Sequence, residues 1–170
     1  MTLHKRYFLL WIFTAMAYLT MSAAQADRPR PDDAAALQGV DSAKAVFDIT
    51  TENPNKLSFY LKLIGETAET MKAAGVEPDF VLTFRGPATF YVSSDRERIK
   101  IEDSLVADSI QAQLDTLSRK SHMKLEQCSV AARALKVDIA TVYPSVKVVG
   151  NSWISLIGYQ NKGYALVPVR

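Results

Sequence analysis

Hydrophobic residues after about position 43 follow two alternating spacings. Short apolar runs bounded by glycine, proline or polar residues are typical of strands, and they alternate with stretches in which apolar residues recur every three or four positions, as in helices. Alternation of this kind predicts an α/β domain built on a parallel sheet. The apolar runs predict five strands, at residues 44–50, 79–84, 123–127, 146–149 and 164–169.

The helical spacing predicts four helices between these strands. The first begins at Asn53, a favourable capping residue, followed by Pro54, which fits a first helical turn, and it ends at Gly75. Residues 89–92 fit either a short strand or a turn of helix, and the pattern favours neither. There is no internal repeat and no second core, so we expect one domain over residues 43–170. The other three helices are expected at residues 104–119, 129–136 and 152–160.

The N-terminal segment has a different pattern. Two basic residues precede an apolar run at 7–21, and small residues follow at Ala24 and Ala26. A basic start, a short apolar stretch and an Ala-x-Ala end are typical of a secretory signal peptide. The run is about 15 residues long, whereas a membrane span needs ~20. We therefore expect a signal peptide at 1–26, cleaved after Ala26, rather than an uncleaved anchor. The mature protein would then be periplasmic, with no stable membrane span.

Cleavage of this segment also changes the charge. The whole chain has 20 basic and 18 acidic side chains, 48% hydrophobic residues and one cysteine, a globular composition that excludes a disulfide scaffold. The signal peptide removes Lys5 and Arg6 and no acid, which leaves a neutral mature chain. No electrostatic attraction to nucleic acid or anionic membranes is therefore expected. Residues 27–42, rich in proline, aspartate and alanine, are predicted to be a flexible leader ahead of the domain at 43–170.

Polar and reactive residues follow four of the predicted strands. In open parallel sheets, ligands bind beyond the carboxyl ends of the strands. That rule brings together the loops after the first four strands. They contain one thiol, Cys128, and the candidate binding residues Asn53, Arg85, Gly86, Asn151 and Ser152.

Cys128 is the candidate reactive residue. It precedes a predicted helix, whose free N–H groups and dipole would stabilise a thiolate. Arg85, if close, would lower the pKa of the thiol further. The alternative is a buried, inert cysteine that packs as a small hydrophobic residue. Position alone favours neither interpretation.

Other kinds of site lack the residues they need. The predicted mature chain has a single histidine, His122, at the opposite end of the strand that ends before Cys128, so neither a Cys–His pair nor a Ser–His–Asp triad is expected. One histidine and one cysteine are also too few for a structural zinc site. The turn after the first strand has no glycine and matches neither a dinucleotide fingerprint nor a P-loop. We expect no metal and no cofactor. Structural or packing roles are expected for Asp48, Trp153, Tyr159 and Tyr164.

Three local patterns, taken with the order of elements, resemble the DsrE/DsrF-like superfamily of small α/β sulfur-relay proteins. The resemblance covers about residues 43–169, and its most specific part is the C-terminal tail. The patterns are LEQCSVA at 125–131, FRGP at 84–87, and VKVVGNS at 146–152 with YQNKGYA at 159–165.

The resemblance implies a fold, an assembly and a chemistry. It implies a single flavodoxin-like domain with a mainly parallel sheet of about five strands and helices on both faces, assembled into homotrimers or hexamers. In sulfur-transferring members a cysteine carries sulfur as a persulfide, and here that cysteine is Cys128. We therefore expect an exported sulfur carrier or sulfurtransferase, with a sulfur donor or acceptor protein as partner. Two alternatives stay open, a non-catalytic periplasmic binding module and a thiol redox sensor.

Overall fold

The computed structural model describes residues 31–170, so the predicted signal peptide lies outside the described residues. Within the predicted leader the described residues form one helical turn, α2 (Ala34–Leu37). The domain occupies Leu37–Arg170. Among the described helices, none has the length and apolar character that a membrane span requires.

The domain is built on a five-stranded sheet in which every neighbouring pair is parallel, as the sequence pattern predicts. The strand order is β4-β3-β2-β1-β5. The chain therefore steps in one direction from β1 to β4 and then returns across the sheet to add β5 beside β1. The strands are β1 (Ser42–Ile49), β2 (Glu77–Phe84), β3 (Met123–Cys128), β4 (Lys147–Val149) and β5 (Ala165–Val169).

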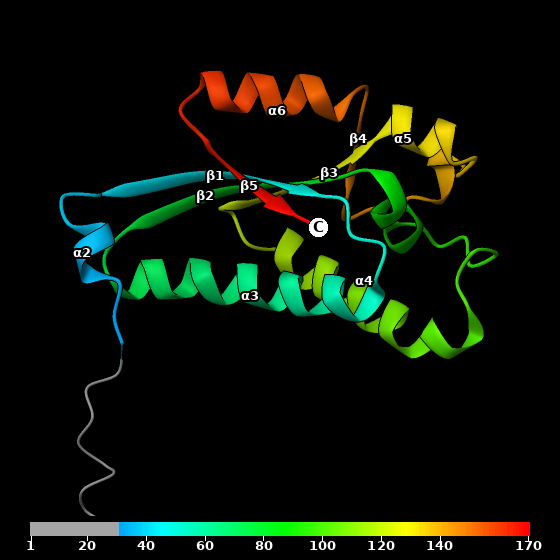
Figure 1. Ribbon diagram of the computed structural model, residues 1–170, viewed down its shortest axis with the longest axis horizontal. Helices are drawn as coiled ribbons and strands as arrows, with labels where there is room; N and C mark the ends of the chain where they lie inside the picture. The colour runs from blue at the N-terminus through cyan, green and yellow to red at the C-terminus, as the bar shows by residue number, and fades with distance from the viewer. Residues whose placement is uncertain (1–30) are drawn as a thin grey trace, which may run out of the picture. The chain divides into compact units, whose positions relative to one another are not determined.

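Helices cover both faces of the sheet (Figure 1). Because parallel crossovers are right-handed, the steps from β1 to β3 place α3 and α4 on one face, and the return step places α6 on the other. The main helices are α3 (Pro54–Ala73), α4 (Ser104–Ser118), α5 (Ser129–Ala134) and α6 (Ser152–Asn161). Short 3₁₀ helices are η1 (Gly86–Val92), η2 (Ile101–Asp103) and η3 (Ile139–Thr141).

Residues 89–92, which fitted either a strand or a helical turn, belong to η1. Gly86 begins this helix with a φ of +55°, a conformation that glycine adopts at little cost, and Pro87 follows in its first turn. This pair turns the chain away from the sheet directly after β2.

The two faces of the sheet differ in what they bury. The face under α3 and α4 holds the larger core, in which Phe47 and Phe80 pack edge-to-face with ring centroids 5.2 Å apart. The face under α6 holds a small cluster of Val46, Val81, Leu156 and Tyr164. Alternate residues of a strand share a face, so this second face also carries the buried polar or reactive residues Asp48, Thr83, Glu126 and Cys128.

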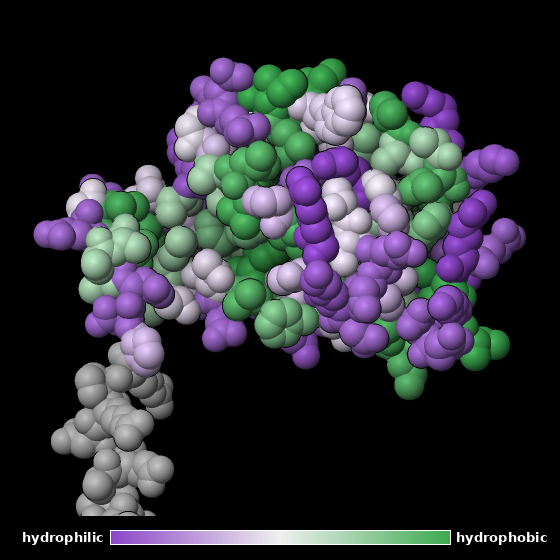
Figure 2. Space-filling view, viewed as in Figure 1, coloured by the Kyte–Doolittle hydropathy of each residue, from purple (hydrophilic) through white to green (hydrophobic). Residues whose placement is uncertain are grey.

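Tyr159 of α6 and Tyr164, in the turn that follows α6, contact this polar face. The hydroxyl of Tyr159 donates a hydrogen bond to Glu126 Oε1 at 2.9 Å, and that of Tyr164 donates to Asp79 Oδ2 at 2.5 Å. Their rings pack edge-to-face, 4.9 Å apart. The outer side of α6 remains exposed, and apolar residues reach the surface over it at the top of Figure 2.

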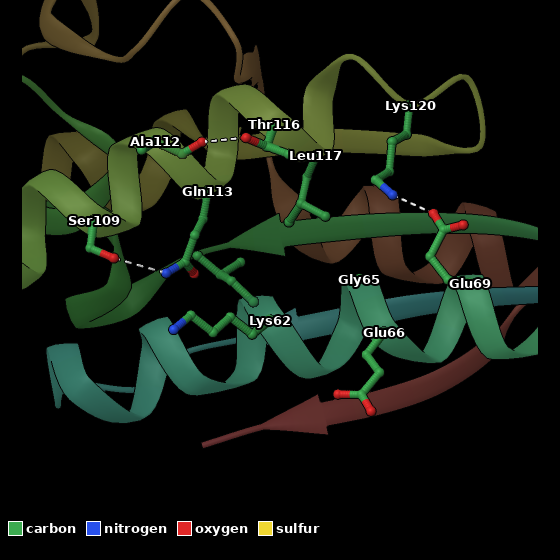
Figure 3. Close-up of a pocket in the computed structure, with 11 residues that line it drawn as sticks. Lys62, Gly65, Glu66, Glu69, Ser109, Ala112, Gln113, Thr116, Leu117 and Lys120 are labelled. Atoms are coloured by element: carbon green, nitrogen blue, oxygen red, sulfur yellow. Dashed lines mark hydrogen bonds and ion pairs between the residues drawn. The ribbon is translucent and has the colours of Figure 1, made fainter.

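A groove of about 410 Å³ lies between α3 and α4 (Figure 3). Gly65 lets the two helices approach closely here, because a Cβ atom on Gly65 would lie 3.3 Å from Leu117 Cδ2. Lys120 and Glu69 form an ion pair across one end of the groove.

Gly65→Val is expected to lower the free energy of unfolding by about 1–3 kcal/mol, since a branched side chain has no room against Leu117. The measurement is urea unfolding. Glu66→Val is the matched control, because it places the same side chain one position further on, where the surface is exposed; its change should stay within about 0.5 kcal/mol. A loss in Gly65→Val no greater than that in Glu66→Val would contradict a close α3–α4 contact at this position, because valine has a higher helix propensity than glycine.

Candidate active site around Cys128

Cys128 ends β3 and caps the N-terminus of α5. Its sulfur accepts two backbone hydrogen bonds, from Ala131 N–H at 3.5 Å in α5 and from Ser152 N–H at 3.3 Å in α6. The residue is 3% exposed. Two separate helices therefore direct N–H groups at one buried thiol.

The β4–α6 loop is fixed so that Ser152 faces the thiol. Asn151 caps α6, because its side-chain oxygen accepts a hydrogen bond from Trp153 N–H at 3.0 Å. Ser129 Oγ donates to the carbonyl of Gly150 at 2.8 Å and joins this loop to the start of α5. The loop that follows β4 is thereby held against the end of β3.

The environment favours the thiolate form of Cys128. Burial raises the pKa of the thiol, but the Ser152 hydroxyl, the Ser152 N–H and the N–H groups at the start of α5 stabilise the thiolate, and the net effect lowers the pKa of Cys128 below its ordinary value. Ser152 Oγ is buried and makes no hydrogen bond of ordinary geometry to any residue from 31 to 170. This hydroxyl is therefore free to turn toward a negatively charged sulfur.

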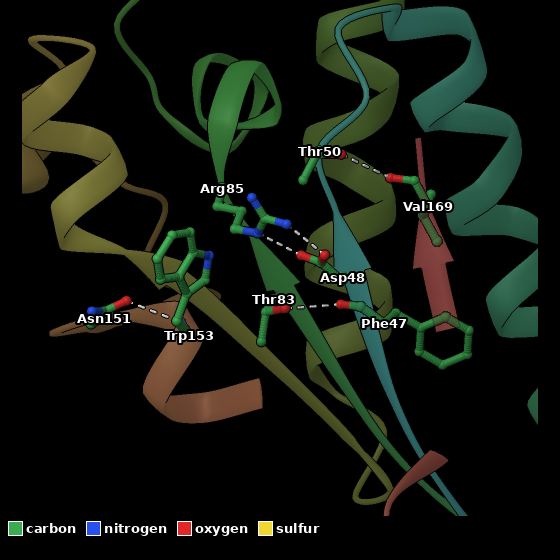
Figure 4. Close-up of polar contacts among 8 residues, drawn as sticks. All are labelled: Phe47, Asp48, Thr50, Thr83, Arg85, Asn151, Trp153 and Val169. Carbon is green, nitrogen blue, oxygen red and sulfur yellow. Dashed lines mark hydrogen bonds and ion pairs between the residues drawn. The ribbon is translucent and has the colours of Figure 1, made fainter. Parts of the chain in front are cut away.

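Arg85, directly after β2, is held by Asp48 of β1 (Figure 4). Its Nε and Nη2 donate to the two carboxylate oxygens of Asp48 at 2.7 and 2.6 Å. This bidentate pair raises the pKa of Arg85, and the negative charge of a Cys128 thiolate raises it further. Because that attraction is mutual, Arg85 also favours the thiolate.

Asp48 was expected to have a structural role, and it has one beside the site. The sequence contained a signal for this pair, since oppositely charged residues stand near the carboxyl ends of two strands. The parallel register, which pairs Ile49 with Phe84, places Asp48 within reach of Arg85. Trp153, for which a packing role was expected, is exposed in the single chain.

Asn53 lies at a different cavity. It caps α3 by accepting a hydrogen bond from Lys56 N–H at 3.0 Å. It also lines a cavity of about 600 Å³ together with Tyr91, Arg98 and Lys100, and neither Cys128 nor Ser152 lines that cavity. Of the predicted site residues, the structure therefore brings Asn151 and Ser152 to the thiol and places Arg85 within electrostatic reach, whereas Gly86 shapes the turn after β2.

Gln127, which sequence reasoning missed, holds the Cys128 main chain from the opposite face of the sheet. Its fully buried side-chain amide donates to the Cys128 carbonyl at 2.9 Å and to Thr89 Oγ1 at 3.0 Å. The amide directly before Cys128 at the end of the strand was the available signal.

No group of three or more histidine, cysteine, aspartate or glutamate side chains suited to a metal ion occurs within residues 31–170. His122 precedes β3 and Cys128 ends it, so the two residues are separated by the length of the strand. His122 is half-buried, and burial lowers its pKa.

Comparison with known proteins identifies the family. Residues 44–169 match the DsrE/DsrF-like family. An uncharacterised protein of Aquifex aeolicus (strain VF5) is 36% identical over 125 residues, which are 74% of this chain and 55% of that protein, so the chain spans about half the length of this relative. A solved protein of unknown function from Methanobacterium thermoautotrophicum, MTH1491, superimposes with a TM-score of 0.58 at 14% identity, over 74% of this chain and 98% of that one. The fold and the sequence match agree: this chain belongs to the DsrE/DsrF-like family.

Proposed function

We propose that this protein carries a sulfur atom as a persulfide on Cys128. The observation that supports this most strongly is the pair of N–H groups from α5 and α6 on one sulfur, with the Ser152 hydroxyl beside it, which has no partner among residues 31–170. These groups lower the pKa of Cys128 although the thiol is buried. A thiolate is the form that both attacks sulfur and leaves from it.

The transfer needs no metal and no external oxidant. In loading, the Cys128 thiolate attacks the outer sulfur of a donor persulfide; the Sγ–S bond forms, the donor's S–S bond breaks, and the donor leaves as a thiolate. In unloading, an acceptor thiolate attacks the outer sulfur and Cys128 leaves as a thiolate. Sulfur moves between thiols and there is no net oxidation. The same N–H groups stabilise the attacking thiolate in the first step and the leaving thiolate in the second.

The fixed position of Arg85 gives it a defined part in this scheme. A persulfide is anionic near neutral pH, and the guanidinium, locked by Asp48, supplies a nearby positive charge that cannot be lost by deprotonation. We infer that Arg85 favours anionic sulfur at the site.

We also propose that the protein acts in the periplasm as a homo-oligomer, after cleavage behind Ala26, with a donor or acceptor protein in that compartment. The signal-peptide pattern of residues 1–26 supports the location. Sequencing the N-terminus of the exported protein checks it: the expected first residue is Asp27, and a retained Met1 would contradict cleavage.

Intact-mass measurement after incubation with a small-molecule persulfide tests the proposed function. We expect the mass of one added sulfur, its removal by an acceptor thiol, and no addition to Cys128→Ser. Ser155→Ala, in the same helix as Ser152, should load normally. A protein that gains oxygen with peroxide but no sulfur would be a thiol redox sensor, and one that gains neither would be a binding module; both results overturn sulfur transfer.

A further inference from the structure

The outer face of α6 has the composition of a buried surface. The ten residues of this helix, SWISLIGYQN, include no charged side chain. Trp153, Ile154 and Ile157 are 64%, 69% and 60% exposed. A helix at the surface of a soluble domain normally turns polar and charged residues to water, and a helix that is apolar on all sides is normally covered. By contrast, the outer side of α3 carries charged residues such as Lys62 and Glu66.

Gly158, on the same outer face, is not explained by the packing of this chain. A Cβ atom placed on it would meet no other atom of residues 31–170 within 4 Å. Glycine in a helix interior lowers stability by about 1 kcal/mol relative to alanine, and no contact within the described monomer compensates for this loss. Ile154 lies one helical turn before Gly158 and projects on the same side. The face therefore combines a protruding side chain and a hollow about one turn apart.

We infer that two copies of this chain pack α6 against α6, antiparallel about a two-fold axis, with Ile154 of each copy over Gly158 of the other. A two-fold contact brings the same surface of each copy together, so the protrusion and the hollow must both lie on that surface, as they do here. A surface without charge can also meet its own copy without placing like charges together.

The edge of the sheet at β5 offers a poorer contact between copies than α6 does. The carbonyl of Val169 accepts a hydrogen bond from Thr50 N–H at 2.9 Å, so the backbone groups of Val169 face β1. The backbone of the preceding residue, Pro168, then faces outward, and proline has no N–H to donate. Strand pairing through β5 is thereby disfavoured relative to a contact through α6.

The contact has two consequences. Ser152 begins α6 at Cys128, so antiparallel packing places the Asn161–Lys162 end of one copy beside the thiol end of the other. An assembly built with this two-fold contact also has an even number of copies, which permits a dimer or a hexamer and excludes a trimer. Neither consequence depends on whether Cys128 carries sulfur.

Native mass and cross-linking test the contact in the purified protein. We expect an even number of copies, and for Ile154→Asp a rise of about thirtyfold or more in the dissociation constant of the contact. Ile101→Asp, at an even more exposed isoleucine in η2, is the matched control and should leave the mass unchanged. In Cys128→Ser protein, Ile157→Cys should form an intermolecular disulfide readily, whereas Ile101→Cys should not.

A monomer, an odd number of copies, or an unchanged mass in folded Ile154→Asp would overturn the inference. Cross-linking through Ile157→Cys that is no better than through Ile101→Cys would also overturn it. If Ile154→Asp does not fold, the comparison of cross-linking through Ile157→Cys and Ile101→Cys still tests the contact.

Discussion

Arg85→Ala is expected to lower the free energy of unfolding by about 3 kcal/mol, the low end of the range for breaking a buried ion pair by removing one partner. The variant leaves the Asp48 carboxylate buried and without the two hydrogen bonds that it now accepts at 2.7 and 2.6 Å. The smaller loss of stability is expected because the Arg85 side chain is 27% exposed, so that water partly screens its charge. Chemical denaturation at neutral pH measures the loss.

Two comparisons isolate the cause. The double variant Asp48→Ala/Arg85→Ala should lose less stability than Arg85→Ala alone, because no unpaired charge remains. Arg96→Ala breaks a pair with Asp108 that is exposed on both sides, and it should change stability by only about 0–1 kcal/mol. If Arg85→Ala cost no more than Arg96→Ala, the Asp48–Arg85 pair would not hold the ends of β1 and β2 together.

Ser152→Ala is expected to raise the pKa of Cys128 by about one unit, because a hydrogen bond to a charged group contributes about 1.5–3 kcal/mol and one pKa unit corresponds to about 1.4 kcal/mol. At a pH well below the folded pKa of Cys128, alkylation of the thiol should slow by about tenfold, in proportion to the fraction of thiolate. The measurement is the iodoacetamide rate as a function of pH. Ser155→Ala is the control, and an unchanged profile in Ser152→Ala would contradict a role for the hydroxyl.

The same variant should lower stability only on the alkaline side. A thiol whose pKa is lower in the folded than in the unfolded protein stabilises the fold fully above the unfolded pKa of about 8.5, and this contribution disappears as the pH falls through the folded pKa. Ser152→Ala removes part of that contribution. Under acidic conditions it should be neutral or stabilising, because the buried hydroxyl has no hydrogen-bond partner among residues 31–170.

Hydrophobic spacing was enough to predict the sheet. Each of the five strands lies where an apolar run predicted it. The reason is clearest for the central strands β1 and β2, because strands covered on both faces need a continuous apolar sequence. The helix starting at Asn53–Pro54 also follows from local chemistry, since the Asn53 side chain accepts the hydrogen bond that a capping residue should. Residues 89–92 were ambiguous because η1 depends on the positive φ of Gly86, a property of the turn and not of the apolar pattern.

Of the site, only its location at one edge of the sheet could be predicted. The strand-end rule placed Cys128 and Ser152 together, but it could not say which backbone group points at the sulfur, because that depends on how Asn151 caps α6. It also placed Asn53 with them, whereas the loop after β1 leads to α3 on the opposite face. The pairing of Asp48 with Arg85 was not predicted, because strand register cannot be read from one sequence.

The ultraviolet absorbance of the thiolate, titrated against pH in folded and unfolded protein, tests most directly whether the fold activates Cys128. The chain has a single cysteine, so a comparison with Cys128→Ser assigns the signal without ambiguity. The structure predicts a midpoint below the ordinary value of about 8.5 in the folded protein, returning to that value on unfolding. A folded midpoint at or above 8.5 would mean that burial outweighs the N–H groups of α5 and α6, and would contradict a sulfur-carrying role for Cys128.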